Sequence, residues 1–381
     1  MNAALLDEFG IGDARARDES WRYSKTALRA LSQQEFTQAG VHSTLDASLA
    51  ARFDWPQTGG RRLVFINGSY SEAHSDVGSI AAGVSVRHEA GQRLTLTLTG
   101  DSTEPVHLVH ASVPGAAPTR WQAFADLDLL AGRANVIEQF VGAAGADVLG
   151  VLHSRITIAP GAELHLTALS DLPDSVSQYR RVNTTVAHGG VCRFTDAIFG
   201  GRLQRADLNI GLNGEGARFE SRGAFVLRGR QHADTHLDIR HAARDTICDV
   251  LWRGVADQRA RGVFHGAITV AAGADGADAR LSNKNLLLSA QAEIDTQPVL
   301  EIYADEVKAA HGATVGQLDE TALFYLRSRG VPADVARSLL IAGFCREAFA
   351  GIADGDVRGR IDALLAERLP HSQFDREGVA G

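Results

Sequence analysis

One histidine in the stretch LEIYADEVKAAHGATVG, residues 300–316, has the residue type and the neighbours of a metal ligand. The stretch opens with Leu300 and Ile302 on one face and acidic residues on the other, an alternation that predicts a β-strand. It then reaches His311, which stands among small residues that would let another backbone approach closely. An imidazole can bind iron through one ring nitrogen while an acceptor holds the other. The residues alone leave three roles open for His311: a metal ligand, an interface residue or a satisfied core group.

A second histidine-rich segment, HADTHLDIRH, carries imidazole or carboxylate groups at alternate positions, namely His232, Asp234, His236 and Asp238. On a strand these four side chains share one face, because successive side chains point to opposite sides. Such a row predicts either a metal-binding stripe or the polar outer face of a coil with stacked histidines. His241 has the opposite parity, so the three histidines do not form one simple group.

The three cysteines, Cys192, Cys248 and Cys345, are scattered along the chain. Their number and spacing indicate neither a disulfide framework nor a closed zinc site, and they fit a reducing cytoplasm. We expect them to be small buried residues. Cys248, which precedes an aspartate in an expected strand, is the one cysteine whose reactivity we would test.

The composition excludes several classes of protein. The 381 residues include 38 Lys and Arg against 46 Asp and Glu, a net charge of −8 that argues against nucleic-acid binding. The chain has no apolar run of about 18 residues, so we expect no membrane span. It also lacks a phosphate-binding G-x-x-x-x-G-K-[ST] sequence, and the glycine-rich GLNGEGARF is expected to be a turn. The N-terminus has no basic segment followed by an apolar one, so we expect no secretory signal and a cytoplasmic location.

Three regions would position these residues. Residues 1–60 and 317–381 have the spacing of helices, whereas residues 61–316 consist of short alternating segments such as RLTLTLTG. Turn residues break these segments, as in APGAE, and few helical windows intervene, so a doubly wound α/β fold is not expected. A mainly β protein of this kind is a sandwich, a barrel or a stacked solenoid, and the repeated strand–turn–strand units favour the solenoid.

The C-terminal helices are expected to bind a partner. Their apolar side chains offer more area than three short helices normally hide alone, and burial of this area favours docking. The residues concerned are Phe324, Leu326, Leu339, Leu340 and Phe344.

Several segments resemble the SufB/SufD family of iron–sulfur cluster assembly proteins. They are ESWRYSKTALRAL, HADTHLDIRH, RGVFHGAITVAAGADGADARLSNKNLLLS and the long stretch from NKNLLLSAQAEIDTQPVLEIYADEV through KAAHGATVGQLDETALFYLRSRGVPADVARSLL. They occur in the family's order over most of the chain, and the length and the WRYS segment are closer to the SufD branch.

The resemblance implies a right-handed parallel β-helix flanked by N-terminal and C-terminal helical regions. It also implies a non-catalytic subunit of a complex with SufB and the ATPase SufC. SufB would pair through the end of the β-helix, where Ile302 and Tyr303 lie on an expected edge strand, and SufC would bind the C-terminal helices. ATP would be bound by SufC, and a homodimer is expected when SufB is missing.

The resemblance further implies that His311 lies near the SufB interface and takes part in cluster formation. Many relatives carry a cysteine two residues before this histidine, but this chain has Ala309 there. The chain would then contribute the imidazole, with Glu306 or Asp305 as weaker oxygen ligands, and the partner would contribute sulfur. Iron or a nascent cluster would be held only transiently and only in the complex.

If the resemblance is set aside, a second function stays open. A β-solenoid can be a secreted enzyme that acts on polysaccharides, with carboxylates and basic residues on one exposed strand face. The sequence offers neither a secretory signal nor a clustered carboxylate pair for that reading.

Overall fold

A computed structural model describes residues 21–40, 45–52, 62–76, 83–89, 93–102, 104–352 and 354–369. The expected helix before residue 21 lies outside these residues.

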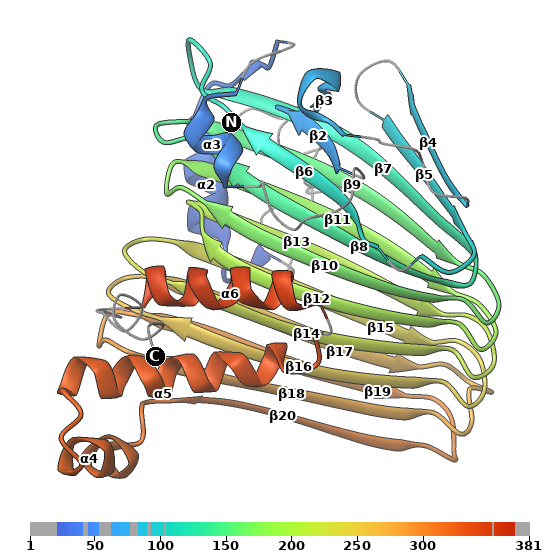
Figure 1. Ribbon diagram of the computed structural model, residues 1–381. Helices are drawn as coiled ribbons and strands as arrows, with labels where there is room; N and C mark the ends of the chain where they lie inside the picture. The colour runs from blue at the N-terminus through green and yellow to red at the C-terminus, as the bar shows by residue number, and fades with distance from the viewer. Residues whose placement is uncertain are drawn as a thin grey trace, which may run out of the picture.

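The described chain winds into a β-solenoid whose coils each contribute one strand to two facing sheets (Figure 1). The first sheet contains β1 (Thr37–Gln38), β4 (Val84–Glu89), β5 (Arg93–Thr99), β7 (Thr119–Ala131), β9 (Val148–Ile158), β11 (Val176–Val186), β13 (Leu203–Leu212), β15 (His232–His241), β17 (Arg261–Val270) and β19 (Glu293–Ile302). The second contains β2 (Arg62–Ile66), β3 (Ser69–Tyr70), β6 (Val106–Ser112), β8 (Arg133–Gly142), β10 (Glu163–Leu172), β12 (Val191–Gly200), β14 (Arg218–Leu227), β16 (Ile247–Ala256), β18 (Asp278–Leu287) and β20 (Lys308–Gly316). The prediction of a mainly β solenoid is confirmed.

Alternation along each strand builds the core between the sheets. Every second side chain points inward, and the parallel register stacks equivalent positions of successive coils into rows. One such row runs through Val136, Leu166, Phe194, Ser221, Val250 and Leu281. These rows bury apolar area along the whole length of the solenoid, which is the main source of its stability.

The corners need a residue with a positive φ angle. Gly161, Gly189 and Gly216 occupy the same position in three successive coils, with φ between 61° and 71°. Each of these glycines donates its N–H to the corner of the following coil. Glycine adopts this left-handed conformation without a side-chain clash, which explains the turn signals in the sequence.

Helices cover parts of both outer faces. They are α2 (Lys25–Gln33), α3 (Ala47–Ala51), the 3-10 helix η2 (Glu72–His74), α4 (Glu320–Ser328), α5 (Ala333–Phe349) and α6 (Gly355–Arg368). Helices α5 and α6 lie across the second sheet (Figure 1), where Ile341 and Phe349 pack against Phe199 and Val226. On the first sheet, Trp21 and residues of α2 pack against Tyr179 and Leu203. Strand ends beneath these helices are therefore buried on both faces.

The two ends of the solenoid differ. At the N-terminal end, antiparallel hairpins replace the parallel coil, because β3 folds back on β2 and β4 folds back on β5. At the C-terminal end, β19 and β20 are the last strands of their sheets. Only the C-terminal end of the described solenoid therefore finishes in a complete parallel coil with an unpaired edge.

Candidate functional site

His311 lies on the open C-terminal coil. It belongs to β20, whose residues are exposed except for the half-buried Ala313. Its register partner on β18 is Leu281, which is the last member of the inward-facing row described above. His311 therefore continues that row, and it is exposed because no further coil of the described residues covers it. The imidazole occupies the position where a partner's coil would stack.

Ala309 points to the same side of β20 as His311. It pairs with the inward-facing Ala279, which in turn pairs with Cys248 and continues the row to Cys192. A side chain at position 309 would thus face the same partner surface as His311. In this chain that side chain is a methyl group and supplies no ligand atom.

The three cysteines cannot substitute for a thiolate at this end. All are free and buried, and burial raises the pKa of each thiol to about 12. Since the thiolate is the form that binds metal and attacks electrophiles, these thiols are inert in the folded chain. Cys248, which we singled out for testing, therefore has the surroundings of a packing residue.

The two candidate oxygen ligands lie apart from His311. Asp305 and Glu306 are exposed in the corner between β19 and β20, and the Glu306 carbonyl accepts the Gly276 N–H at 2.6 Å. His311 is three residues beyond the start of β20, roughly 10 Å along the strand. Among the described residues, no group of three or more His, Cys, Asp or Glu side chains could hold a metal ion. Any metal site here would need ligands from a second chain.

The expected interface residues differ in exposure. On the open coil, Ile302 is 40% and Tyr303 is 63% exposed. In the C-terminal helices, Phe324 on α4 is 70% and Leu339 on α5 is 44% exposed. The remaining three, Leu326, Leu340 and Phe344, are half-buried.

Phe344 takes part in the attachment of α5 to the solenoid. The guanidinium of Arg253 on β16 lies over its ring at 5.6 Å and donates to the Glu347 carboxylate at 3.0 Å. Our sequence reasoning missed Tyr325, which is exposed beside Phe324. The pattern of apolar residues in α4 contained this signal, but we did not use it.

The histidine stripe of β15 is occupied by other parts of the chain. His232, Asp234 and His236 do share one face, as expected, but they are buried. The Ser24 hydroxyl bonds to the Asp234 carboxylate and lies 2.8 Å from Nε2 of His232. Arg205 donates to Asp234 at 2.7 Å. These contacts engage His232 and Asp234, so the segment around Ser24 covers that part of the stripe. Asp238, the fourth residue of the stripe, is exposed.

Stacking is also present in this segment. The ring of His236 stacks on His265 of the next coil at 4.7 Å. Burial is the main cause that lowers the pKa of His232, to about 4. A neutral, hydrogen-bonded His232 agrees with the second predicted role, in which these residues form the polar outer face of a coil. Sequence reasoning missed Ser24 and Arg205 because neither lies in the stripe itself.

Comparison with known proteins identifies the family. Residues 131–344 match the family model described as SUF system FeS cluster assembly, SufBD core domain. This match covers more than half of the chain, and the chain belongs to this family.

Similar proteins extend the match. The chain is 29% identical to the iron–sulfur cluster assembly protein SufD of Escherichia coli, over 93% of this chain and 89% of that protein. It is also 29% identical to an iron–sulfur cluster assembly SufBD family protein of Synechocystis, over 92% of this chain and 86% of the relative. A SufBD family protein of Mycobacterium tuberculosis is 30% identical over 56% of each chain. Among the described residues, no helix is long and apolar enough to cross a membrane.

Proposed function

We propose that this protein is a non-catalytic, SufD-type subunit that supports iron–sulfur cluster formation in a cytoplasmic complex with a SufB-type partner and the ATPase SufC. The observation that carries the proposal is the open C-terminal coil, where an exposed imidazole continues an otherwise buried row. Family membership and the likeness to a SufD protein over most of the chain support the same assignment.

The SufB-type partner would stack its own terminal coil on β19 and β20. This contact would satisfy the unpaired N–H and C=O groups of the edge strands and bury Ile302 and Tyr303. It would also cover the inward-facing row at His311. A solenoid edge of this kind favours a partner with a matching coil over an unrelated globular surface.

The nascent cluster would form at this junction as the cargo of the complex. His311 would supply one imidazole nitrogen, and the partner would supply the sulfur ligands, because position 309 is alanine and the three cysteines are buried. Glu306 would contribute only if the partner brought a further ligand to the corner. ATP would bind to SufC, which would dock on the exposed side of α4 and α5 around Phe324 and Leu339.

Two half-buried carboxylates on the outer face of the second sheet do not favour the alternative of a polysaccharide-acting enzyme. Glu163 pairs with Arg133 at 2.7 Å and with Arg193 at 3.0 Å. Arg193 also pairs with Glu220. Carboxylates held by arginines in this way are poor candidates for the acid and base of a glycosidase.

The test is coexpression of this chain with the SufB-type and SufC-type proteins of the same organism. We expect one complex that contains all three chains and that accumulates iron and sulfide when a sulfur source is supplied. Size-exclusion chromatography, with iron and sulfide analysis of the complex peak, measures both properties. Elution of this chain as a separate species in the presence of both partners would refute the proposal.

A further inference from the structure

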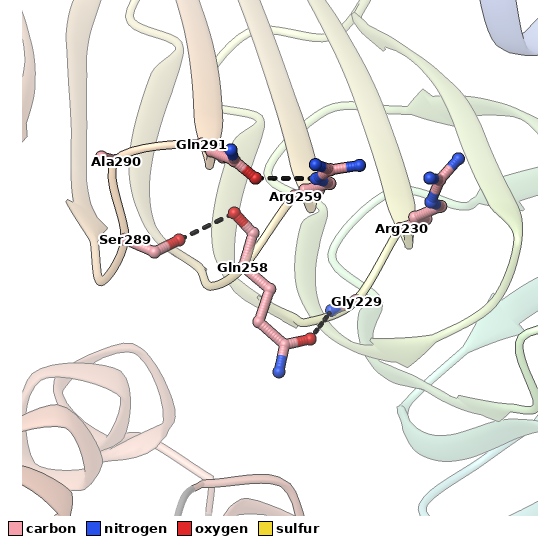
Figure 2. Close-up of a pocket in the computed structure, with 7 residues that line it drawn as sticks. All are labelled: Gly229, Arg230, Gln258, Arg259, Ser289, Ala290 and Gln291. Carbon is pink, nitrogen blue, oxygen red and sulfur yellow. Dashed lines mark hydrogen bonds between the residues drawn. The ribbon is translucent and has the colours of Figure 1, made fainter.

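A hollow of about 480 Å³ lies at one corner of the solenoid, across three successive coils (Figure 2). We call it the corner hollow. It lies between the ends of the second-sheet strands and the starts of the first-sheet strands. The lining residues that matter here are Gly229, Arg230, Gln258, Arg259, Ser289 and Gln291.

Two arginines, Arg230 and Arg259, occupy neighbouring register positions on successive coils at the corner hollow. The N–H of Arg259 donates to the Gly229 carbonyl at 3.0 Å, and two residues later the N–H of Arg261 donates to the Gln231 carbonyl at 2.9 Å. This ladder places Arg259 directly beside Arg230 on the neighbouring coil, at a backbone spacing of about 4.8 Å. Both side chains are exposed, so water screens part of the repulsion between them, and a negative charge beside them would reduce it further.

Elsewhere the solenoid supplies that charge from its own side chains. The outer face of the second sheet alternates Arg133, Glu163, Arg193 and Glu220 across four coils. Close to the hollow itself, Arg261 pairs with Glu293 at 3.0 Å. By contrast, no residue that lines the corner hollow is acidic. Among the described residues, no ion pair involves Arg230 or Arg259.

Hydrogen bonds hold the corner hollow in shape and engage the side-chain oxygen of each glutamine. Oε1 of Gln291 accepts from Nε of Arg259 at 2.7 Å, which fixes this guanidinium (Figure 2). Oε1 of Gln258 accepts the Gly229 N–H at 2.8 Å, and the Gln258 carbonyl accepts from the Ser289 hydroxyl at 2.8 Å. The side-chain donors that remain are the terminal N–H groups of the two arginines and the amide nitrogens of the two glutamines, beside the hydroxyl oxygen of Ser289.

We propose that the corner hollow is a binding site for a phosphate-type oxyanion. Arg230 and Arg259 would each donate charge-assisted hydrogen bonds to its oxygens, and Gln258 would donate from its amide. The anion would supply to these two guanidiniums the negative charge that no carboxylate of the described residues supplies. The proposal is independent of the proposed role in cluster assembly, because it involves neither His311 nor the open coil.

The same chemistry could come from free inorganic phosphate or from the phosphate chain of a larger ligand. Isothermal titration of the full-length protein in chloride buffer, with inorganic phosphate and with pyrophosphate as separate probes, distinguishes these sources. Equal affinity for both probes identifies a single-phosphate site. At least tenfold tighter binding of pyrophosphate identifies a site for a phosphate chain. Either result supports the proposal.

The matched variants are Arg230→Gln, Arg259→Gln and, as control, Arg240→Gln. Arg240 is an exposed arginine on β15 outside the corner hollow, and its substitution changes the net charge by the same amount. We expect each variant in the corner hollow to bind the phosphate probes about tenfold more weakly, because one charge-assisted hydrogen bond is lost. We expect the control to bind them as the wild type does. Absence of saturable binding of both probes by the wild type, or equal loss in the control, would overturn the proposal.

Discussion

Leu281 and His311 are register partners on adjacent strands, yet Leu281 is only 4% exposed and His311 is exposed. The difference arises from position alone, because Leu281 is covered by one more coil and His311 is not. An imidazole in an apolar row would lack hydrogen-bond partners if an identical coil covered it. A metal or a polar group from a partner would satisfy it, so this pair marks the place where a second chain completes the structure.

Replacement of His311 tests its role in the complex. We expect His311→Ala to leave folding and subunit association unchanged, because the side chain is exposed. The amount of iron and sulfide per complex should fall several-fold, since one ligand is lost. The control is Thr314→Ala, an exposed change on the other face of β20. Clusters that assemble at the normal rate with His311→Ala would make His311 an interface residue only.

A thiol at position 309 should strengthen iron binding. Ala309 lies in an inward-facing row beside that of His311, so Ala309→Cys would place a sulfur on the side of the partner. An exposed thiol ionises far more readily than the buried native cysteines. We expect more iron retained per complex after gel filtration, measured by metal analysis. Ala310→Cys, on the opposite face, is the control, and equal gains in both variants would contradict the geometry.

Proline at position 302 should weaken pairing at the open edge. The N–H of Tyr303 donates to the carbonyl of Val270 on the neighbouring strand β17, at 2.9 Å. The N–H of the preceding residue, Ile302, therefore points away from β17, towards the open edge. Ile302→Pro removes that donor, and we expect several-fold weaker association with a SufB-type partner or a second copy. Ile302→Ala keeps the backbone N–H at position 302. It therefore separates the loss of the hydrogen-bond donor from the loss of the isoleucine side chain. Sedimentation velocity measures both, and an unchanged assembly in the proline variant would argue against strand pairing.

The exposed side of α4 and α5 can be tested without removal of the helices. Deletion after Gly316 would also uncover Phe199 and Val226, which α5 and α6 bury. We therefore expect a cleaner result from Phe324→Ser with Leu339→Ser, which should reduce SufC binding at least tenfold in a pull-down or titration. Leu130→Ser, at an exposed leucine on β7, is the control. Binding that survives the double change would place the SufC contact elsewhere.

Buried histidines should make the fold sensitive to acid. Burial lowers the pKa of His107 from 6.5 to about 4, although its hydrogen bond to Gln139 opposes the shift. The unfolded chain takes up the proton near pH 6.5, whereas the folded chain resists it, so stability present above pH 6.5 is lost as the pH falls towards 4. Urea unfolding between pH 7 and pH 5 should show this decline. His107→Gln should flatten the dependence by up to about 1.4 kcal/mol per pH unit, and His188→Gln, at an exposed site, should not.

The sequence predicted the parts of the structure that depend on local pattern. Alternation identified the strands, the turn residues identified the corners, and the parity of HADTHLDIRH placed four of its side chains on one face. The pattern could not show that Ser24 closes that face, because the contact joins residues more than 200 positions apart. The half-buried state of Leu340 and Phe344 was likewise invisible, since it depends on how α5 lies on the second sheet.

The unlike ends of the solenoid limit how many chains can join. A solenoid with a complete parallel coil at both ends could stack head to tail without limit and form a fibre. In the part of the chain that the structure describes, the hairpins at β3 and β4 leave one end without such a coil, so a single stacking event uses the available surface. Assembly by stacking then stops at two chains. A second copy of this chain and a different subunit would compete for the same open C-terminal coil.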